Sequence, residues 1–598
     1  MNSRGIKVFA WLTLAGFVVA AGSQARLQVF RRDAVLDLGE KSGRFLVKRV
    51  EPARRGAILS ADNRPLAQDA SAREFGLIFD DVPFSRTFFM ELSEASGIPA
   101  SEMLQLKASG VRTTFWREPL TESKAKRVED VKIRWRADGV SLRRVAERDY
   151  PLGIAAAGVV GALRDGKPIT GIEVSKSKTL EGHDGLTIGL TDSKGKFLPM
   201  RIDPRTKTRV DGEDVVLTLD SRLQLVATQA LKEAVESNNA DQGAVVILNP
   251  KTGDILAMAS WPSYDPARLG QPTGSKERFT DFNPNYMAAL EPGSTFKILT
   301  LALALEKGVV NSTDVVQCGG SLQVWSNRSV RCDLHGGTRA HGTVDLEKAI
   351  SKSCNVSAAT WALRVGSPDF IEFLDRSGLM RKTQLGLPLE ASGQFVRDEY
   401  AKGLQLATFG FGQSMTCTPV GLASVFSALG NGGVRMEPRL IAKVGGRDTK
   451  EREAGRLFSK ETADQVLGYM ESVIESDSGT GKSLRIPGYR LAGKTGTAQK
   501  INRSTGTVEG GGYVSNFVGL VPAQNPQALI LVMIDNPKAG KYYGASVAGP
   551  VFVESAQAVV RLLGIPPTPG KDVVPSPKAS PSPDIEIRST KQQGGASN

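Results

Sequence analysis

The chain has 598 residues, of which 40% are hydrophobic and 23% charged, as in soluble globular proteins of two or three domains. Lys and Arg outnumber Asp and Glu by 76 to 63, which gives a formal net charge of +13. This excess is spread along the chain without a zinc-finger or basic-aromatic pattern, so nucleic acid is not expected as a partner, whereas an anionic surface or acidic polymer fits the charge. Only three histidines are present, which argues against histidine-based catalysis or a histidine-rich metal site.

The N-terminal residues carry a targeting signal. Arg4 and Lys7 precede an uncharged run over 8–25 that is long enough to cross a bilayer as a helix. We therefore expect a short cytoplasmic segment at 1–7 and a transmembrane signal-anchor at 8–25, with the body of the chain outside. A cleaved signal peptide is the alternative, because Ser23-Gln24-Ala25 resembles a cleavage site and basic residues also follow the run.

The region 39–213 is polar and mixed in pattern. Residues 47–59 predict a strand that enters a turn, and residues 84–106 predict an amphipathic helix that is broken at Gly97-Ile98-Pro99. No catalytic cluster is evident in this region. A structural or partner-binding module is therefore the expectation for 39–213.

A second unit is predicted over 214–564. Its pattern begins and ends with apolar strands and is dominated by helices between them; the predicted strands are 215–220, 243–248, 254–260, 515–520 and 528–534, and the predicted flanking helices are 221–236 and 551–563. This order predicts an α+β domain whose terminal segments meet in one antiparallel sheet. The Pro/Ser-rich composition of 565–598 cannot bury a core, so a disordered tail is expected there.

The stretch from Glu291 to Lys297 is a candidate catalytic element. Pro292-Gly293 predicts a turn, and the apolar run after Phe296 predicts a buried helix. Ser294 and Lys297 are three residues apart, so on a helix they share one face. A serine needs a base to act as a nucleophile, and a lysine whose pKa is lowered by burial can serve. Ser-x-x-Lys is common by chance, and its significance depends on further elements downstream.

Two such elements follow. Ser353 and Asn355 form Ser-x-Asn, and Lys494-Thr495-Gly496-Thr497 predicts a strand that carries a cation, two hydroxyls and a glycine allowing close approach of a substrate backbone. The order Ser-x-x-Lys, Ser-x-Asn, Lys-Thr-Gly is typical of penicillin-binding proteins and class A β-lactamases. The span from about 55 to 563 further resembles a class B penicillin-binding protein, closest to the cell-division branch, as the additional matches show: Asn283, Gly410-Phe411-Gly412, Arg55-Gly56, Arg148-x-Tyr150-Pro151 and Gly171-Ile172-Glu173.

The resemblance implies the fold and the reaction. The fold would be an N-terminal membrane anchor, an elongated mixed α/β pedestal of the dimerisation type (39–213), and a β-lactamase-like transpeptidase domain (214–564) with helices packed on an antiparallel sheet. The reaction would be the cross-linking of peptidoglycan stem peptides by a serine-type D-Ala-D-Ala transpeptidase, during septal wall synthesis and without a glycosyltransferase domain. The expected place is the bacterial inner membrane, single-pass, with the catalytic domain extracytoplasmic.

The resemblance also assigns roles to residues. Ser294 would be the nucleophile and Lys297 the base, hydrogen-bonded to Ser294; Ser353 would relay a proton, Asn355 would orient Lys297 and a substrate amide, and Lys494 would tune the field of the site. Thr495 and Thr497 would bind the terminal carboxylate, beside Gly496. No metal or organic cofactor is implied. The expected partners are stem peptides, β-lactams, membrane lipid around the N-terminal helix, a separate glycan-strand polymerase and other division proteins, and no nucleic acid.

Alternatives and one further feature remain open. An elongation-type transpeptidase, a hydrolytic relative, and a non-catalytic penicillin sensor or scaffold share parts of this pattern. Cys318 and Cys332 flank a predicted short hairpin, and outside the cytoplasm they would form either a disulfide or two buried free thiols. Cys354, the middle residue of Ser-x-Asn, stands at a position that varies in the family.

Overall fold

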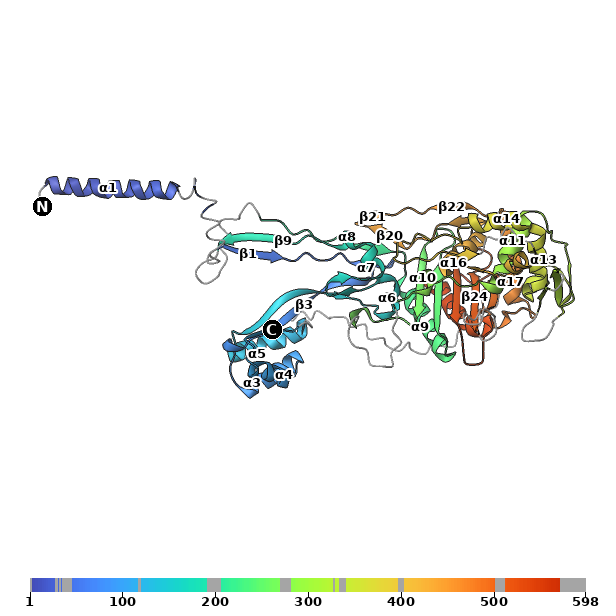
Figure 1. Cartoon of the computed structure of the whole chain (residues 1–598), viewed down its shortest axis with the longest axis horizontal. Coiled ribbons are helices and arrows are strands. Elements are labelled where there is room, and N and C mark those ends of the chain that lie inside the picture. The colour runs from blue at the N-terminus through green and yellow to red at the C-terminus, as the bar shows by residue number, and fades with distance from the viewer. Residues whose placement is uncertain are drawn as a thin grey trace. The chain divides into compact units, whose positions relative to one another are not determined.

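The computed structural model describes residues 3–26, 29, 31, 34, 46–116, 120–190, 206–268, 281–325, 328–332, 340–395, 403–500 and 511–570 (Figure 1). The chain begins with helix α1 (Ser3–Ala25). Lys7–Ala25 of this helix is long and apolar enough to cross a membrane, a property that signal sequences share. It is therefore a candidate anchor. The predicted tail 565–598 lies outside the described residues from 571 onward.

The chain divides into two compact units, one formed by 1–56 with 181–213 and the other by 57–180 with 214–598. In the first unit, β1 (Leu46–Glu51) pairs antiparallel with β9 (Gly185–Leu190), Leu46 opposite Leu190. The carboxylates of Asp184 and Asp211 accept hydrogen bonds from the backbone N–H groups of Ala53 and Arg54, at 2.8 and 2.9 Å. These bonds join the end of segment 1–56 to segment 181–213 within the first unit.

The N-terminal part of the second unit is built around a long hairpin. Strand β3 (Pro65–Ile78) pairs antiparallel with β6 (Val140–Asp149) from Gln68 to Leu77. Helices α3 (Arg86–Ser96), α4 (Ala100–Ala108) and α5 (Glu122–Trp135) form a separate small core with the far end of this hairpin. The predicted break is confirmed: Gly97 ends α3 at a φ of +83°. The remaining elements here are β2 (Ile58–Leu59), η2 (Phe79–Asp81), β4 (Thr113–Phe115), β5 (Leu120–Thr121), α6 (Ile154–Val160), β7 (Leu163–Arg164), β8 (Lys167–Pro168), α7 (Gly171–Ser175) and α8 (Ser177–Leu180).

A mixed sheet crosses the predicted domain boundary at 213/214. Its strand order is β21-β20-β10-β2-β3-β4, with β5 and β6 also on β3. Strand β10 (Val215–Leu217) lies parallel to β2 and antiparallel to β20 (Ile441–Val444). The first strand after the boundary thus joins strands that precede it, beginning with β2, to the later strands β20 and β21 (Arg447–Asp448).

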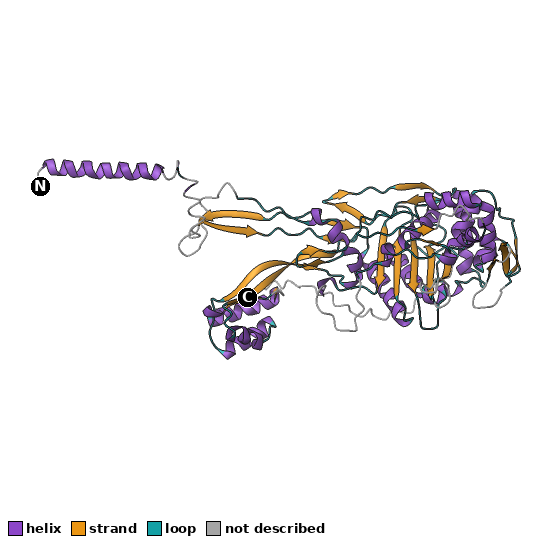
Figure 2. Ribbon diagram, in the orientation of Figure 1, coloured by secondary structure: helices purple, strands orange, loops and turns teal. Residues whose placement is uncertain are grey.

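The predicted antiparallel sheet from the two ends of the C-terminal region is confirmed (Figure 2). Its order is β12-β11-β25-β24-β23, and its strands are β11 (Gln242–Leu248), β12 (Ile255–Trp261), β23 (Ala492–Gln499), β24 (Tyr513–Val521) and β25 (Ala528–Asp535). Every residue of β25 is buried. Because side chains alternate along a strand, both faces of β25 must be covered by helices.

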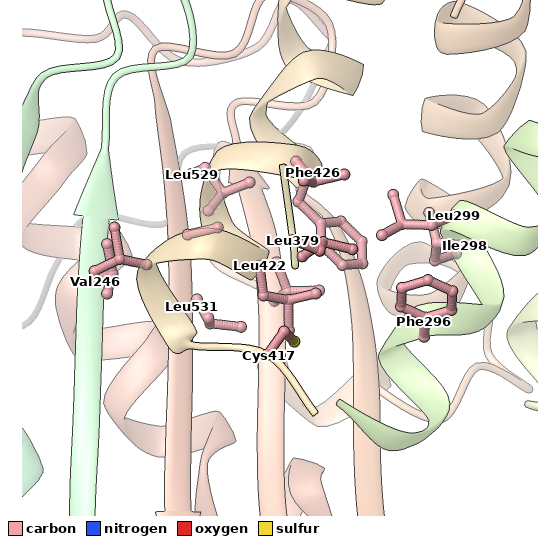
Figure 3. Close-up of a cluster of buried hydrophobic side chains, with 14 of the residues drawn as sticks. Val246, Phe296, Ile298, Leu299, Leu379, Cys417, Leu422, Phe426, Leu529 and Leu531 are labelled. Carbon is pink, nitrogen blue, oxygen red and sulfur yellow. The ribbon is translucent and has the colours of Figure 1, made fainter. Parts of the chain in front are cut away.

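One face carries α9 (Ser221–Ser237) and α19 (Gly549–Leu562), which pack on Ile530 and Val532. Leu529 and Leu531 point to the other face, toward α16 (Pro419–Ser427), in a buried cluster that also includes residues of α11 (Lys297–Glu306), as Figure 3 shows. The α+β class is therefore confirmed. The remaining elements of this region are η3 (Pro266–Arg268), α10 (Pro284–Met287), η4 (Gly293–Phe296), β13 (Val316–Cys318), β14 (Ser321–Trp325), β15 (Arg328–Arg331), β16 (Gly342–Val344), α12 (Leu346–Ser351), α13 (Asn355–Val365), α14 (Ser367–Arg376), β17 (Gln394–Phe395), α15 (Leu404–Phe409), β18 (Met415–Thr416), η5 (Ala428–Asn431), β19 (Val434–Met436), β21 (Arg447–Asp448), β22 (Glu453–Arg456), α17 (Lys460–Glu475), η6 (Lys482–Leu484) and α18 (Gly544–Val547).

Candidate active site

Ser294 lies in the 3₁₀ turn η4, immediately before α11 rather than within an α-helix. The turn needs Gly293, whose φ is +57° and where an added Cβ would lie 2.9 Å from the Cβ of Ala498 on β23. Behind the turn, the residues of α11 from Lys297 to Ala304 are all buried. A rigid, buried helix therefore fixes Ser294 against the edge strand of the sheet.

Lys297 is 1% exposed, and its Nζ donates to the carbonyl oxygen of Ser353 at 2.7 Å and to the Ser353 Oγ at 3.0 Å. The predicted hydrogen bond from Lys297 to Ser294 is not formed. Ser353 supplies both acceptors of the Lys297 ammonium group instead, and its φ of +57° is uncommon for a residue other than glycine. Burial lowers the pKa of Lys297 to about 8.

Lys494 is also fully buried, and its Nζ donates to the Ser353 Oγ at 2.9 Å and to the carbonyl oxygen of Thr495 at 2.9 Å. Burial, and then the charge of Lys297, hold the pKa of Lys494 well below its usual value. Neither lysine forms an ion pair with any described residue. The Ser353 hydroxyl thus lies between two buried amines, an arrangement that favours loss of a proton from one of them.

Asn355 begins α13, and its Nδ2 donates to the carbonyl oxygen of Arg331 at 2.8 Å. The structure places this amide against β15, whereas the sequence predicted contact with Lys297. Its observed bond fastens the Ser-x-Asn segment to the neighbouring hairpin. Three of the predicted residues therefore contact one another: Lys297 and Lys494 both bind Ser353. The Asn355 side chain forms no hydrogen bond with these three described residues but holds the neighbouring segment in place through Arg331.

Strand β23 brings the predicted substrate-binding residues to the same place. The Thr495 Oγ1 lies 3.1 Å from the Thr480 Oγ1, and the Thr497 Oγ1 accepts a hydrogen bond from the Gly544 N–H at 3.2 Å. A Cβ on Gly496 would lie 1.6 Å from the Oδ1 of Asn516. Only glycine therefore fits between β24 and the turn that carries Ser294.

Sequence reasoning missed two residues of this site. The buried Asn516 on β24 donates from Nδ2 to the carbonyl oxygen of Pro292 at 2.9 Å, which ties the central sheet to the turn before Ser294. Thr480 follows α17 and faces Thr495. A polar residue inside the apolar strand 513–521 was the available signal for Asn516, whereas nothing in the sequence near Thr480 marks it.

Comparison with known proteins agrees with this geometry. Residues 243–557 match the penicillin-binding protein transpeptidase domain, and residues 50–217 match the penicillin-binding protein dimerisation domain. The chain therefore belongs to the penicillin-binding proteins. The presence of these two domains places it among the class B members of the family, and its catalytic domain is a transpeptidase.

Relatives match over nearly the whole chain. The probable peptidoglycan D,D-transpeptidase PenA of Neisseria meningitidis is 30% identical over 95% of this chain and 94% of that protein. The peptidoglycan D,D-transpeptidase FtsI of Escherichia coli is 30% identical over 91% and 90%. The crystal structure of penicillin-binding protein 3 from Mycobacterium tuberculosis, complexed with aztreonam, superimposes with a TM-score of 0.65 at 27% identity, covering 88% of this chain and 99% of that one.

Proposed function

We propose that this transpeptidase cross-links peptidoglycan stem peptides in septal wall synthesis, with Ser294 as its nucleophile and Lys297 as its base. The observation that carries the assignment is the Ser353 hydroxyl, which lies 3.0 and 2.9 Å from the amines of two fully buried lysines. Such a cluster can exchange protons among its members without solvent.

In the acylation step, neutral Lys297 takes the proton of Ser294, and the Ser294 Oγ bonds to the carbonyl carbon between two terminal D-alanines. Ser353 passes a proton from Lys297 to the departing amine as the C–N bond breaks and one D-alanine leaves. The backbone N–H groups of Ser294 and Thr497 hold the oxyanion, a contribution of about 3–4 kcal/mol per donor in comparable sites.

In the transfer step, an amine of a neighbouring strand attacks the ester carbon. A new amide bond forms and the bond between the acyl carbon and the Ser294 Oγ breaks. The proton lost by the amine returns to the Ser294 Oγ through Ser353 and Lys297. Thr495 and Thr497 bind the terminal carboxylate of the donor peptide, and Lys494 supplies a positive field there whenever it carries the proton. Asn355 acts as a positioning residue for Ser353.

The septal role is supported by the compact pedestal and by the context of Gly171-Ile172-Glu173, which resemble the division branch. In this proposal α1 anchors the chain in the inner membrane with the catalytic domain outside. A separate polymerase supplies the glycan strand, and other division proteins place the enzyme at the division site. Fluorescent fusions imaged in growing cells test it: a signal at mid-cell supports the septal role, and a signal along the side wall supports elongation instead.

Covalent labelling tests the nucleophile. A fluorescent penicillin should attach to the wild-type chain and not to Ser294→Ala. Ser123→Ala, in the exposed face of α5, is the matched control and should label like wild type. A wild-type chain that never labels, or a Ser294→Ala variant that still does, contradicts the assignment.

A further inference from the structure

Behind the Ser-x-Asn segment lies a cluster that the catalytic scheme does not use. Three cysteines and one histidine come together there from separate segments: Cys318 at the end of β13, Cys332 after β15, His341 before β16 and Cys354 before α13. Their sulfur and nitrogen atoms all lie within 4.8 Å of one another. The three cysteines are buried and His341 is half-buried. Nothing in the transpeptidase reaction requires such a group of soft donors.

Three of the six distances among the four donor atoms have the lengths expected at a tetrahedral metal site, and the other three are at most 4.8 Å. The Cys332 Sγ lies 3.6 Å from the Cys318 Sγ and 3.6 Å from the Cys354 Sγ, and the His341 Nδ1 lies 3.4 Å from the Cys318 Sγ. In a zinc tetrahedron with Zn–S near 2.3 Å and Zn–N near 2.0 Å, the edges are about 3.8 Å between two sulfurs and about 3.5 Å between sulfur and nitrogen. The observed separations agree with these edges to within about 0.2 Å.

The surroundings of the sulfurs are suited to thiolates. The backbone N–H of Val356 points at the Cys332 Sγ, and that of Ser357 points at the Cys354 Sγ, both at 3.4 Å. Such N–H donors stabilise the negative charge of metal-bound sulfur. The backbone N–H of His341 donates to the carbonyl oxygen of Cys318 at 3.1 Å, which holds these two residues next to each other.

A single disulfide accounts for less of this arrangement. All four cysteines of the chain are free thiols in the structure. A bridge between Cys318 and Cys332, the pair singled out by the sequence, would leave Cys354 and His341 gathered at the same point without a function. Three thiols and an imidazole in one buried place are the donor set of structural zinc sites.

We propose that Cys318, Cys332, His341 and Cys354 bind one structural zinc ion that fixes the Ser-x-Asn segment of the active site. Binding would displace the protons of the three thiols and leave no coordination position for water, so the ion would have no direct part in catalysis. The resemblance to the family implied no metal, and this chain departs from that expectation at Cys354, the variable middle position of the motif.

The position of the cluster explains what the zinc would do. Cys354 lies between Ser353, which carries both lysine contacts, and Asn355, whose amide binds the carbonyl oxygen of Arg331 next to Cys332. Ser353 has a φ of +57°, a conformation that its surroundings must enforce. A metal that joins Cys354 to Cys332 and Cys318 would hold the Ser-x-Asn segment against two pairs of strands, β13 with β16 and β14 with β15.

Metal content of the purified full-length chain tests the proposal. Grown with added zinc and dialysed, the wild-type chain should retain about one zinc ion per chain by elemental analysis. The Cys318→Ala and His341→Ala variants should bind zinc more than about 100-fold more weakly, beyond the effect of outer-shell changes. Cys417→Ala is the matched control and should keep its zinc, because Cys417 is buried in the apolar cluster of Figure 3.

Two further measurements keep the test independent of folding and of catalysis. Wild-type chain stripped of zinc should regain one ion, and with cobalt in its place should show the absorption bands of thiolate-bound cobalt. Ser294→Ala should keep its zinc although it does not label with penicillin. Three outcomes would overturn the proposal. They are a wild-type chain that takes up neither zinc nor cobalt, an equal loss of zinc in Cys417→Ala and Cys318→Ala, or a Cys318–Cys332 disulfide found by mass spectrometry.

Discussion

Two regions of the protein treat buried positive charge in opposite ways. Near the end of β6, Arg148 lies between Asp69 and Glu173, with nitrogen–oxygen distances of 3.0 and 2.8 Å and all three side chains almost inaccessible. In the active site, Lys297 and Lys494 meet at the Ser353 hydroxyl, and neither forms an ion pair within the described residues.

The difference shows how burial serves stability in one place and chemistry in the other. A buried cation that has anionic partners keeps its charge, and its loss strands those partners in a poorly solvated place. A buried cation without such partners loses its proton more easily. Arg148 therefore stabilises the fold by joining Asp69 to Glu173, whereas Lys297 is able to act as a base.

The largest effect should come from removing the base. Lys297→Met retains most of the buried volume but has no amine, so the rate of acylation by a fluorescent penicillin should fall about 10²- to 10⁴-fold. Lys460→Met, at an exposed position on α17, is the control and should react like wild type. A Lys297→Met rate within about threefold of wild type would remove Lys297 from the mechanism.

Breaking the paired cluster should cost stability instead. Arg148→Met leaves two buried carboxylates without their cation, so the free energy of unfolding should fall by about 3–5 kcal/mol in a denaturant titration. Penicillin labelling of the fraction that remains folded should persist. An Arg148→Met chain as stable as wild type would show that the contacts of Arg148 with the two carboxylates do not stabilise the fold.

Added volume in the site should have a smaller effect. Gly496→Ala places a Cβ 1.6 Å from the Oδ1 of the buried Asn516 side chain, so this side chain or the backbone beside it must move, at a cost of about 1–3 kcal/mol. Gly468→Ala, within α17 and with open space around its Cβ, should instead stabilise the chain by about 0.5–1 kcal/mol. Equal effects of the two changes on the denaturation midpoint would contradict the close approach at Gly496.

The smallest effect should come from an exposed arginine on the same strand as Arg148. Arg143 contacts Glu74 at 2.5 Å, but its side chain is 68% exposed. Arg143→Met should therefore change the free energy of unfolding by no more than about 1 kcal/mol. If it costs as much as Arg148→Met in the same titration, burial is not what distinguishes the two arginines.

The sequence predicted the central sheet because apolar strands recur at both ends of the C-terminal region, and it predicted the meeting of three motifs because their order is typical of a family. It could not predict the partner of Lys297, because Ser353 lies 56 residues away in the sequence and not at helical spacing from the lysine. The contact of Asn516 with Pro292 depends on two segments that are distant in sequence. For the same reason the spacing of Cys318 and Cys332 predicts either a disulfide or two buried thiols, whereas nothing in the sequence brings His341 and Cys354 to them.

The pH dependence of acylation tests most directly the claim that burial without an ion-pair partner makes Lys297 a base. Because the amine acts only when neutral, the acylation rate of wild type should rise about tenfold per pH unit at low pH and level off above the pKa of about 8. Reaction of penicillin in buffer alone is subtracted at each pH, and Lys297→Met should lack this rise. A rate that is independent of pH from 6 to 10, or that rises only near the ordinary lysine pKa of about 10.4, would contradict the account.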